Sequence, residues 1–250
     1  MAALSWLTAR PIAHRGYHDA ATRRIENTLP AAEAAIARGF AIECDLQPTS
    51  DGEVVVFHDD TLERLTDLTG PVAKQPLAVL RKARIKDSGA QIPTLEELLD
   101  LVDGRVPLII ELKSRFDGDR RLEAATAAVL AAYTGPAAVM SFDPAALIAM
   151  RQFAPMLPRG MLADRFLTAD WPGLPLATRF TARHMLAAPM VMPSFVAYDV
   201  NALPTSVPLA LRHFFRLPLL AWTIRTPEQR RVARAWADQI IFEGFDPDTG

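Results

Sequence analysis

The chain has 250 residues, half of them apolar, and its 27 basic and 29 acidic side chains leave a formal net charge of -2. This length is enough to bury one sizeable core and is typical of a single α/β barrel. The charge balance argues against binding along a nucleic acid, because no basic excess is available to neutralise a run of phosphates. A small anionic substrate remains compatible with this composition, since its site needs only a few local cations.

Cysteine content and hydropathy narrow the class of protein further. Cys44 is the one cysteine, so neither an intramolecular disulfide nor a four-thiolate metal site can form. The N-terminal residues lack the charged start and the continuous apolar stretch of a signal peptide. Since no apolar run reaches the length of a membrane span, we expect a cytoplasmic protein without stable membrane insertion. The oligomeric state stays open.

Short apolar runs alternate with helical segments from the start of the chain. Residues 10–14 predict a strand, and the alanine-rich residues 29–38 predict a helix that ends at Gly39. Residues 41–45 form the next expected strand. The turn-rich residues after it lead into a further strand at 53–58, which suggests a hairpin-like excursion.

The alternation continues after a polar, irregular stretch at residues 59–93, which resembles an insertion or a long loop. The next strand is expected at residues 107–113 and the next helix at 119–133. Further strands are expected at residues 137–142, 159–162, 191–198, 217–223 and 239–243. The corresponding helices are expected at residues 143–153, 174–187, 204–214 and 227–237.

Strands that alternate with helices predict a parallel sheet. About eight core strands in a chain of this length favour closure into one TIM-type (β/α)8 barrel domain over residues 1–250. An open doubly wound sheet is less favoured, because no Gly-x-Gly-x-x-Gly turn follows the first strand. The sequence stops soon after the last strand. Either the barrel lacks its final helix or another element covers that side.

Ionisable side chains stand at the ends of several predicted strands. Because side chains two residues apart face the same side of a strand, Glu43 shares a face with Asp45, and Glu111 with Lys113. A barrel gathers the carboxyl ends of its strands at one rim, where its active sites lie. The groups expected to meet there are His14, Arg15, Glu43, Asp45, His58, Glu111 and Lys113.

This set of side chains suits the chemistry of a phosphoester. The carboxylates of Glu43, Asp45 and Glu111 suit a hard divalent cation, Mg²⁺ or Ca²⁺. Arg15 and Lys113 suit a phosphate, one through its planar guanidinium and the other as a point charge. The two histidines suit paired proton transfers. Together the groups describe phosphoryl transfer without a further cofactor.

Each of these residues also has a purely structural explanation. Glu111 and Lys113 could form only an ion pair inside the barrel. We interpret His18, His184 and His213 as structural, and Cys44 as packed between a strand and a helix. The functional interpretation rests on the fact that several strands carry ionisable groups at the same end.

The ordered set of short motifs resembles the glycerophosphodiester phosphodiesterase family. Each motif is weak alone, but the set in this order and at these spacings is specific and runs from the first strand nearly to the last residue. The motifs are His14-Arg15-Gly16, Glu26-Asn27-Thr28, Glu43-Cys44-Asp45, Asp51-Gly52, Val55-Val56-Phe57-His58-Asp59, Glu111-Leu112-Lys113, Ser141-Phe142 and Trp222-Thr223.

The resemblance implies a TIM-type barrel with a small insertion after the His58 strand, at about residues 60–92. It implies hydrolysis of a small-molecule glycerophosphodiester to glycerol 3-phosphate and an alcohol, and a place in lipid metabolism. By motif position, His14 and His58 would be the general acid/base pair. The divalent metal would be held by Glu43, Asp45 and Glu111, and the phosphoryl oxygens would be contacted by Arg15 and Lys113.

The family motif at the rim matches Glu26 and Asn27, and Trp222 and Glu243 are further rim candidates. Thr28 could alternatively be only the N-cap of the helix that follows. The sequence does not assign acid and base between the two histidines. It also leaves water and the adjacent glycerol hydroxyl open as the nucleophile.

Two departures from the family pattern concern the rim. The family usually carries an Asp-Gly-Ile-Ile-Thr-Asp-type run near the last strand, whereas this chain reads Asp238-Gln-Ile-Ile-Phe-Glu243. Arg225 stands where the family often has asparagine, and an extra cation there could favour a substrate with more negative charge. The departures leave the alcohol specificity open.

Two alternative functions remain. One is a related barrel phosphodiesterase for another headgroup, phospholipase-like or acting on a sugar phosphodiester. A phospholipase would need an apolar rim, which residues 171–193 could supply, although we expect them to pack in the core. The other is an inactive phosphoester-binding barrel. The paired histidines argue against it, because binding alone does not require both proton-transfer groups.

Overall fold

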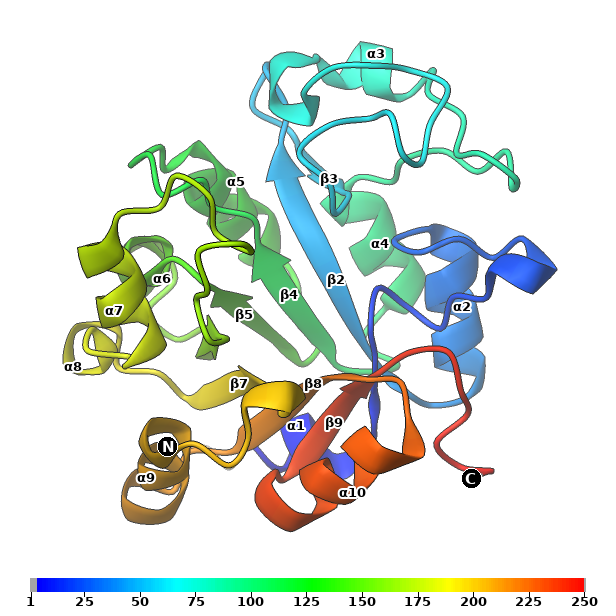
Figure 1. Cartoon of the computed structure of the whole chain (residues 1–250). Helices are drawn as coiled ribbons and strands as arrows, with labels where there is room; N and C mark the ends of the chain where they lie inside the picture. Colours follow the sequence, from blue (N-terminus) through cyan, green and yellow to red (C-terminus); the bar gives the residue numbers. More distant parts are fainter. Residues whose placement is uncertain (1–3, 250) are drawn as a thin grey trace.

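Parallel strands close into a barrel in the computed structural model of the protein, which describes residues 4–249 (Figure 1). The strands are β1 (Ile12–Ala13), β2 (Ala41–Pro48), β3 (Val54–Val56), β4 (Leu108–Leu112), β5 (Ala137–Ser141), β6 (Arg159–Ala163), β7 (Phe195–Asp199), β8 (Leu219–Ile224) and β9 (Gln239–Phe242). All except β3 pair in parallel, in the order β1-β9-β8-β7-β6-β5-β4-β2, and β2 pairs with β1 to close the ring. The expected (β/α)8 barrel is confirmed.

Helices follow most of the barrel strands and cover the outside of the barrel (Figure 1). The α-helices are α1 (Ser5–Ala9), α2 (Leu29–Ala37), α3 (Leu77–Leu80), α4 (Leu95–Val102), α5 (Arg121–Leu130), α6 (Pro144–Phe153), α7 (Leu176–Arg183), α8 (Ala188–Val191), α9 (Ser206–Phe215) and α10 (Pro227–Trp236). Short 3-10 turns lie at Ala20–Thr22, Val72–Lys74 and Val200–Ala202.

Helix α4 was not expected from the apolar pattern. Its start is fixed by a capping box, in which the Thr94 hydroxyl accepts from the Glu97 amide and the Glu97 carboxylate accepts from the Thr94 amide. The Thr-x-x-Glu signature in the sequence could have revealed this helix.

The barrel interior is filled by the inward-facing residues of alternate strand positions. Leu7 of α1 is completely buried and packs with this interior cluster. Gln239, the first residue of β9, donates a side-chain hydrogen bond to the Thr8 carbonyl at 2.9 Å, so α1 lies against the amino end of the strands. The rest of the cluster consists of Ile12, Ala41, Ile109, Ala138, Met140, Leu162, Phe195, Ala197, Leu220 and Ile241.

No helix follows β9 within residues 4–249, and aromatic side chains cover the outside of the barrel there. Phe242 of β9 packs edge-to-face on Phe40 with ring centroids 5.2 Å apart, and the ring centroid of Phe245 lies 5.4 Å from that of Phe242. Tyr17 completes the group, 5.4 Å from Phe40. The phenylalanine that departs from the family pattern at position 242 therefore packs against the rings that occupy the place of a final helix.

The hairpin-like excursion expected at residues 53–58 is confirmed, because β3 pairs antiparallel with β2. β3 is shorter than expected and ends at Val56, so His58 follows a hairpin strand and does not end a barrel strand. The hairpin nevertheless leads the chain back to the rim. The Phe57 amide donates to the Asp45 carbonyl at 2.9 Å, which places His58 next to the upper part of β2.

Residues 60–92 lie beyond the carboxyl end of β2, at the top of Figure 1. They contain α3 and a 3-10 turn, and their apolar side chains form a cluster separate from the barrel core, with β3 residues at its base. The buried members of this cluster are Val55, Phe57, Leu62, Val72, Leu80, Ala83, Ile85 and Ile92.

Our expectation that residues 171–193 pack in the core is wrong for most of their large apolar side chains. Ala182, Met185 and Val191 are buried, but several others on and around α7 and α8 are more than half exposed. These are Leu176, Phe180, Leu186, Met190 and Met192. Within residues 4–249, no helix has the length and hydropathy needed to cross a membrane.

Gly160 of β6 leaves room in the barrel interior for a neighbouring ring, so a larger residue there should destabilise the protein. A Cβ atom there would overlap the ring of Phe195, its register partner on β7. Gly160→Ala should lower the free energy of unfolding by about 1–3 kcal/mol, and the melting temperature by about 2–10 °C. Calorimetry would measure this.

The double variant Gly160→Ala/Phe195→Leu serves as the control, because the smaller side chain makes room for the new methyl group. It should lose less stability than the sum of the two single variants. An unchanged melting temperature in Gly160→Ala alone would show that the barrel interior is not packed as described.

Candidate active site

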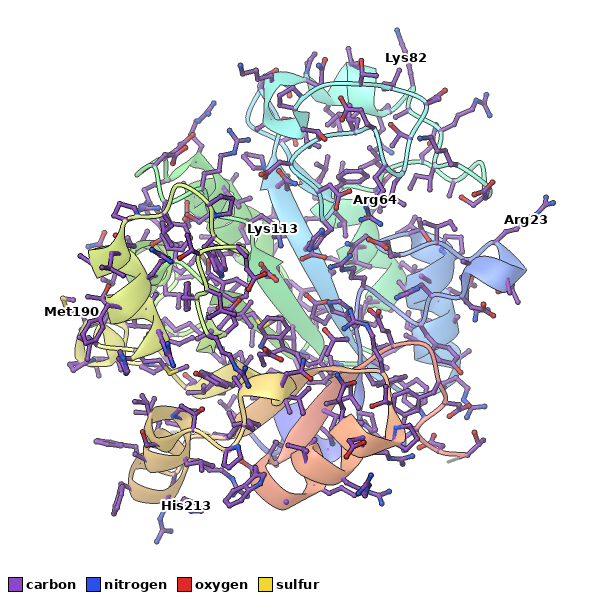
Figure 2. The ribbon with its side chains drawn as sticks, in the orientation of Figure 1. Arg23, Arg64, Lys82, Lys113, Met190 and His213 are labelled. Atoms are coloured by element: carbon purple, nitrogen blue, oxygen red, sulfur yellow. The ribbon has the colours of Figure 1, made fainter. Side chains whose placement is uncertain are left out.

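A pocket of about 350 Å³ opens at the carboxyl ends of the barrel strands. Six of the seven ionisable residues expected at this rim line it: His14, Arg15, Glu43, His58, Glu111 and Lys113. The seventh, Asp45, lies directly beneath and contacts two of them. In Figure 2, Lys113 lies in the central region of the molecule, whereas His213 lies at its periphery, and neither His213 nor His184 lines the pocket.

Three buried carboxylates form the floor of the pocket. Glu43 and Asp45 come from β2, and Glu111 of β4 is the register partner of Asp45. One oxygen from each lies within 4.8 Å of the other two, a grouping that could hold a metal ion. Oδ1 of Asp45 is buried without a hydrogen-bond donor. An all-oxygen cluster with an unsatisfied carboxylate oxygen fits a hard divalent cation.

The charges of this triad repel one another. Burial, and then the neighbouring carboxylates of Asp45 and Glu111, raise the pKa of Glu43 well above its usual range. Burial also raises the pKa of Glu111, more than its ion pair with Lys113 lowers it. Since the folded chain binds these protons more tightly than the unfolded chain does, ionisation of Glu43 and Glu111 destabilises the fold near neutral pH.

Asp45 behaves differently from its two neighbours. Burial opposes its ionisation, but the positive charges around it, first that of Lys113, hold its pKa below its usual range. The Asn27 side-chain amide donates to Asp45 Oδ2 at 2.8 Å, and the Asp45 backbone amide donates to Asn27 Oδ1 at 3.3 Å. Asp45 is therefore the carboxylate of the triad that stays ionised and fixed in place.

Two cations lie against the triad. The Lys113 ammonium is 3.0 Å from Glu111 Oε1 and 3.5 Å from Asp45 Oδ1. Arg15 Nη1 donates to Glu26 Oε1 at 2.7 Å, and its Nε lies 3.4 Å from Asp45 Oδ2, buried without a hydrogen-bond acceptor. Both predicted phosphate ligands are thus at the pocket wall and already paired with carboxylates.

Gly16 lets the chain turn sharply after His14 and Arg15. Its φ is +79°, and a Cβ atom there would lie 2.9 Å from the backbone carbonyl carbon of Ala31 in α2. Any side chain would therefore push α2 away from the loop. Thr28 accepts from the Ala31 amide as the N-cap of α2, which confirms the alternative given for that residue.

Each catalytic candidate histidine is held by a carboxylate through Nδ1. His14 Nδ1 lies 2.5 Å from Glu243 Oε2, and His58 Nδ1 lies 2.8 Å from Asp59 Oδ1. An ionised carboxylate only accepts hydrogen bonds, so in both rings Nδ1 carries the proton and Nε2 is left free as an acceptor. His14 Nε2 lies 3.9 Å from Glu43 Oε2, at the edge of the triad.

Arg225 does not present a free charge to the pocket. It lines the pocket, and its Nε donates to Glu243 Oε1 at 2.5 Å, so its charge is paired with that carboxylate. His18, which we interpreted as structural, lies with Nε2 3.7 Å from the same carboxylate. Although burial opposes ionisation of Glu243, its bonds with His14, His18 and Arg225 hold its pKa below its usual range.

A second network reaches His58 from the inserted segment. Arg64 Nη2 donates to Glu26 Oε1 at 2.7 Å, and its Nε lies 2.5 Å from Asp59 Oδ2. In Figure 2, Arg64 lies toward the centre of the molecule, unlike Lys82 of the same segment. Arg64 thereby links the carboxylate that binds Arg15 to the one that binds His58.

The sequence offered little to identify these supporting residues. Asp59 belongs to the family motif that contains His58, and its position next to that histidine could have identified it as the partner of the ring. Arg64 lies in an irregular segment without a motif. Of the rim candidates, Trp222 lines the pocket. Glu26 and Asn27 contact Arg15, and Glu243 contacts His14, two residues that line it.

The model of the glycerophosphoryl diester phosphodiesterase family matches residues 14–249. The chain belongs to this family. A glycerophosphodiester phosphodiesterase of Caldanaerobacter subterraneus subsp. tengcongensis is 30% identical over 249 residues, which cover 95% of this chain and 94% of that protein.

Solved structures share the fold at lower identity. An Oleispira antarctica phosphodiesterase, solved with its product sn-glycerol-3-phosphate, is 24% identical with a TM-score of 0.76 and covers 94% of this chain and 92% of its own. A glycerophosphodiester phosphodiesterase from Thermotoga maritima is also 24% identical, with a TM-score of 0.70 and coverage of 93% and 94%.

Repulsion within the triad predicts that a divalent cation stabilises the protein. Mg²⁺ or Ca²⁺ at a hundred times its dissociation constant should add about 2.7 kcal/mol, which raises the melting temperature by about 5–10 °C. Glu43→Gln removes one ligand and one repelling charge, so it should melt higher than the wild type without metal and respond less to metal.

Differential scanning fluorimetry with EDTA and with each cation would measure both effects. Glu96→Gln, which changes an exposed carboxylate on α4, is the matched control and should respond to metal like the wild type. Equal metal shifts in the wild type and in Glu43→Gln would exclude the triad as the metal site.

Proposed function

We propose that this member of the family hydrolyses glycerophosphodiesters to glycerol 3-phosphate and an alcohol in the pocket described above. The observation that carries the proposal is the meeting of two carboxylate-bound histidines, His14 and His58, with a buried carboxylate triad in one pocket. A site that only binds a phosphoester would not need two such proton-transfer groups.

In this proposal Glu43, Asp45 and Glu111 hold a divalent cation, Mg²⁺ or Ca²⁺. A bound ion of this kind stabilises negative charge on phosphoryl oxygens as a Lewis acid. The cation would also offset the repulsion that raises the pKa values of Glu43 and Glu111. Binding of the ion and ionisation of these two ligands are therefore coupled.

Arg15 and Lys113 are proposed to contact the phosphoryl oxygens. Arg15 has a buried Nε without an acceptor, and its Nη1 is fixed by Glu26, so its guanidinium is oriented before substrate arrives. The Lys113 ammonium has three donors and lies at the border between the triad and the pocket. Preorganised donors of this kind stabilise the negative charge of a phosphoryl transition state.

The two histidines carry the proton transfers through their free Nε2 atoms. One accepts a proton from the attacking hydroxyl as the new P–O bond forms. If that hydroxyl belongs to water, glycerol 3-phosphate forms directly; if it belongs to the neighbouring glycerol carbon, a cyclic phosphate forms first and water then opens it to glycerol 3-phosphate. The other histidine donates a proton to the alkoxide oxygen as its bond to phosphorus breaks. Glu243 and Asp59 orient the rings and stabilise each imidazolium while it is positively charged.

Removal of either histidine should nearly abolish turnover. His14→Ala and His58→Ala are each expected to lower kcat by about 10²–10⁴-fold, the usual contribution of one positioned acid or base. Release of glycerol 3-phosphate from glycerophosphocholine, measured by a coupled assay, tests this. His213→Ala, at an exposed position on α9, is the control. Near-normal turnover in a folded His14→Ala or His58→Ala variant would remove that residue from the mechanism.

Glu243→Gln should weaken catalysis without removing a reacting group. The amide can donate to His14 Nδ1 and favour the wrong tautomer, so kcat should fall by about 10–100-fold with little change in KM. Glu53→Gln, which alters an exposed carboxylate at the β2–β3 turn, should leave both constants unchanged. A loss confined to KM would instead assign Glu243 to substrate binding.

A further inference from the structure

The wall of the pocket formed by β5 to β8 has no role in the proton transfers. Asp164 follows β6, Asp199 ends β7, Trp222 lies in β8 and Phe142 follows β5, and all four line the pocket. In the closed strand order, β7 stands across the barrel from β2, which carries Glu43 and Asp45. A substrate bound at the triad would therefore extend toward this wall.

Within residues 4–249, the hydrogen-bond donors to Asp164 and Asp199 are neutral. Asp164 accepts from Trp171 Nε1 at 3.0 Å and from the Phe166 amide at 2.5 Å. Asp199 Oδ1 accepts from the backbone and side-chain amides of Asn201, each at 2.9 Å.

Asp170, a third carboxylate of this wall, also lines the pocket. No salt bridge within residues 4–249 joins Asp164, Asp170 or Asp199 to a cation. Burial and then the charges of the other two carboxylates raise the pKa of Asp164. The three carboxylates of the wall are therefore not in ion pairs with cations of the described residues, and a positively charged ligand would favour ionisation of Asp164.

Aromatic rings lie beside these carboxylates. Trp222 is the register partner of Asp199, which sets the indole next to that carboxylate at the rim. Phe142 packs edge-to-face on Trp222 with ring centroids 5.5 Å apart, and on Trp171 at 4.9 Å. The rings are therefore held in place before any ligand binds. Fixed aromatic rings combined with carboxylates are the surroundings that bind ammonium groups.

Arg225 also lines this part of the pocket, but its positive charge does not make the wall positive. Its Nε bonds to Glu243 at 2.5 Å, so its charge is compensated outside the wall. Arg15 and Lys113 lie on the other side, with the triad. The pocket therefore has cations at one end, where a phosphodiester would bind, and carboxylates with aromatic rings at the other.

We propose that this wall binds a positively charged ammonium group on the alcohol of the substrate. The preferred substrates are then zwitterionic glycerophosphodiesters of amino or quaternary-ammonium alcohols, rather than those of neutral polyols. The proposal rests on the phosphodiesterase function proposed above. A neutral polyol could also donate hydroxyl hydrogen bonds to the carboxylates, and the experiment has to separate the two.

The test compares kcat/KM for glycerophosphocholine and glycerophosphoethanolamine with kcat/KM for glycerophosphoglycerol and glycerophosphoinositol. The wild type should prefer the two cationic headgroups. Asp199→Asn and Asp170→Asn keep size and hydrogen-bonding capacity but remove charge, and each should reduce that preference by about tenfold. Asp164→Asn should do the same if its melting temperature matches the wild type. Asp100→Asn, on the exposed face of α4, is the matched control.

A second readout does not require turnover. Choline alone should raise the melting temperature of the wild type and should not raise that of Asp170→Asn/Asp199→Asn. If none of the diesters is hydrolysed but choline still binds through these carboxylates, the phosphodiesterase function fails and the ammonium site stands. Equal preference for cationic and neutral headgroups, or a preference that survives both substitutions, would overturn the ammonium site.

Discussion

The close approach of three buried carboxylates is the constraint on which the rest of the structure depends. Glu43, Asp45 and Glu111 are brought together by the parallel register of β2 and β4, and burial makes their mutual repulsion costly. The residues around them reduce this cost in part: Asn27 donates to Asp45, while Arg15 and Lys113 bring positive charge. In the proposed function, the remaining negative charge favours binding of a divalent cation at the triad.

The two histidines enter this arrangement by different routes. His14 leaves the first barrel strand and meets Glu243, which follows the last one, so its orientation depends on closure of the ring between β1 and β9. His58 arrives on an antiparallel hairpin, and its partner Asp59 is held by Arg64 from the inserted segment. The insertion therefore contributes to the geometry of the site as well as to the surface. In this proposal, catalysis depends on side chains from the first strand, from the end of the last strand and from the inserted segment at residues 60–92.

Strand alternation made the acidic floor predictable from sequence, because residues two apart on β2 and β4 must face the same side. The pairing of His14 with Glu243 could not be predicted in this way, since it depends on how the ring closes between two residues 229 positions apart in the sequence. For Arg225 the sequence showed a charge but not its partner, the carboxylate of Glu243. For His58 the sequence indicated the hairpin, but not that the hairpin strand ends at Val56 and that the chain then returns to the rim. Asp164 and Asp199 could not be predicted as site residues, because single aspartates after strands are common. The fold shows that they share a wall of the pocket with Trp222.

The aromatic group at Tyr17, Phe40, Phe242 and Phe245 makes the seam between β9 and β1 unlike the other seven. Elsewhere a helix spans the outside of neighbouring strands, whereas within residues 4–249 ring contacts and the short β1 ladder hold this edge. Such a seam is a natural place for local opening at a lower free energy than global unfolding. Opening there would separate His14 from Glu243 but leave β2 paired with β4. Thermal inactivation would then precede global unfolding, because the three carboxylates would still be assembled after His14 and Glu243 have separated.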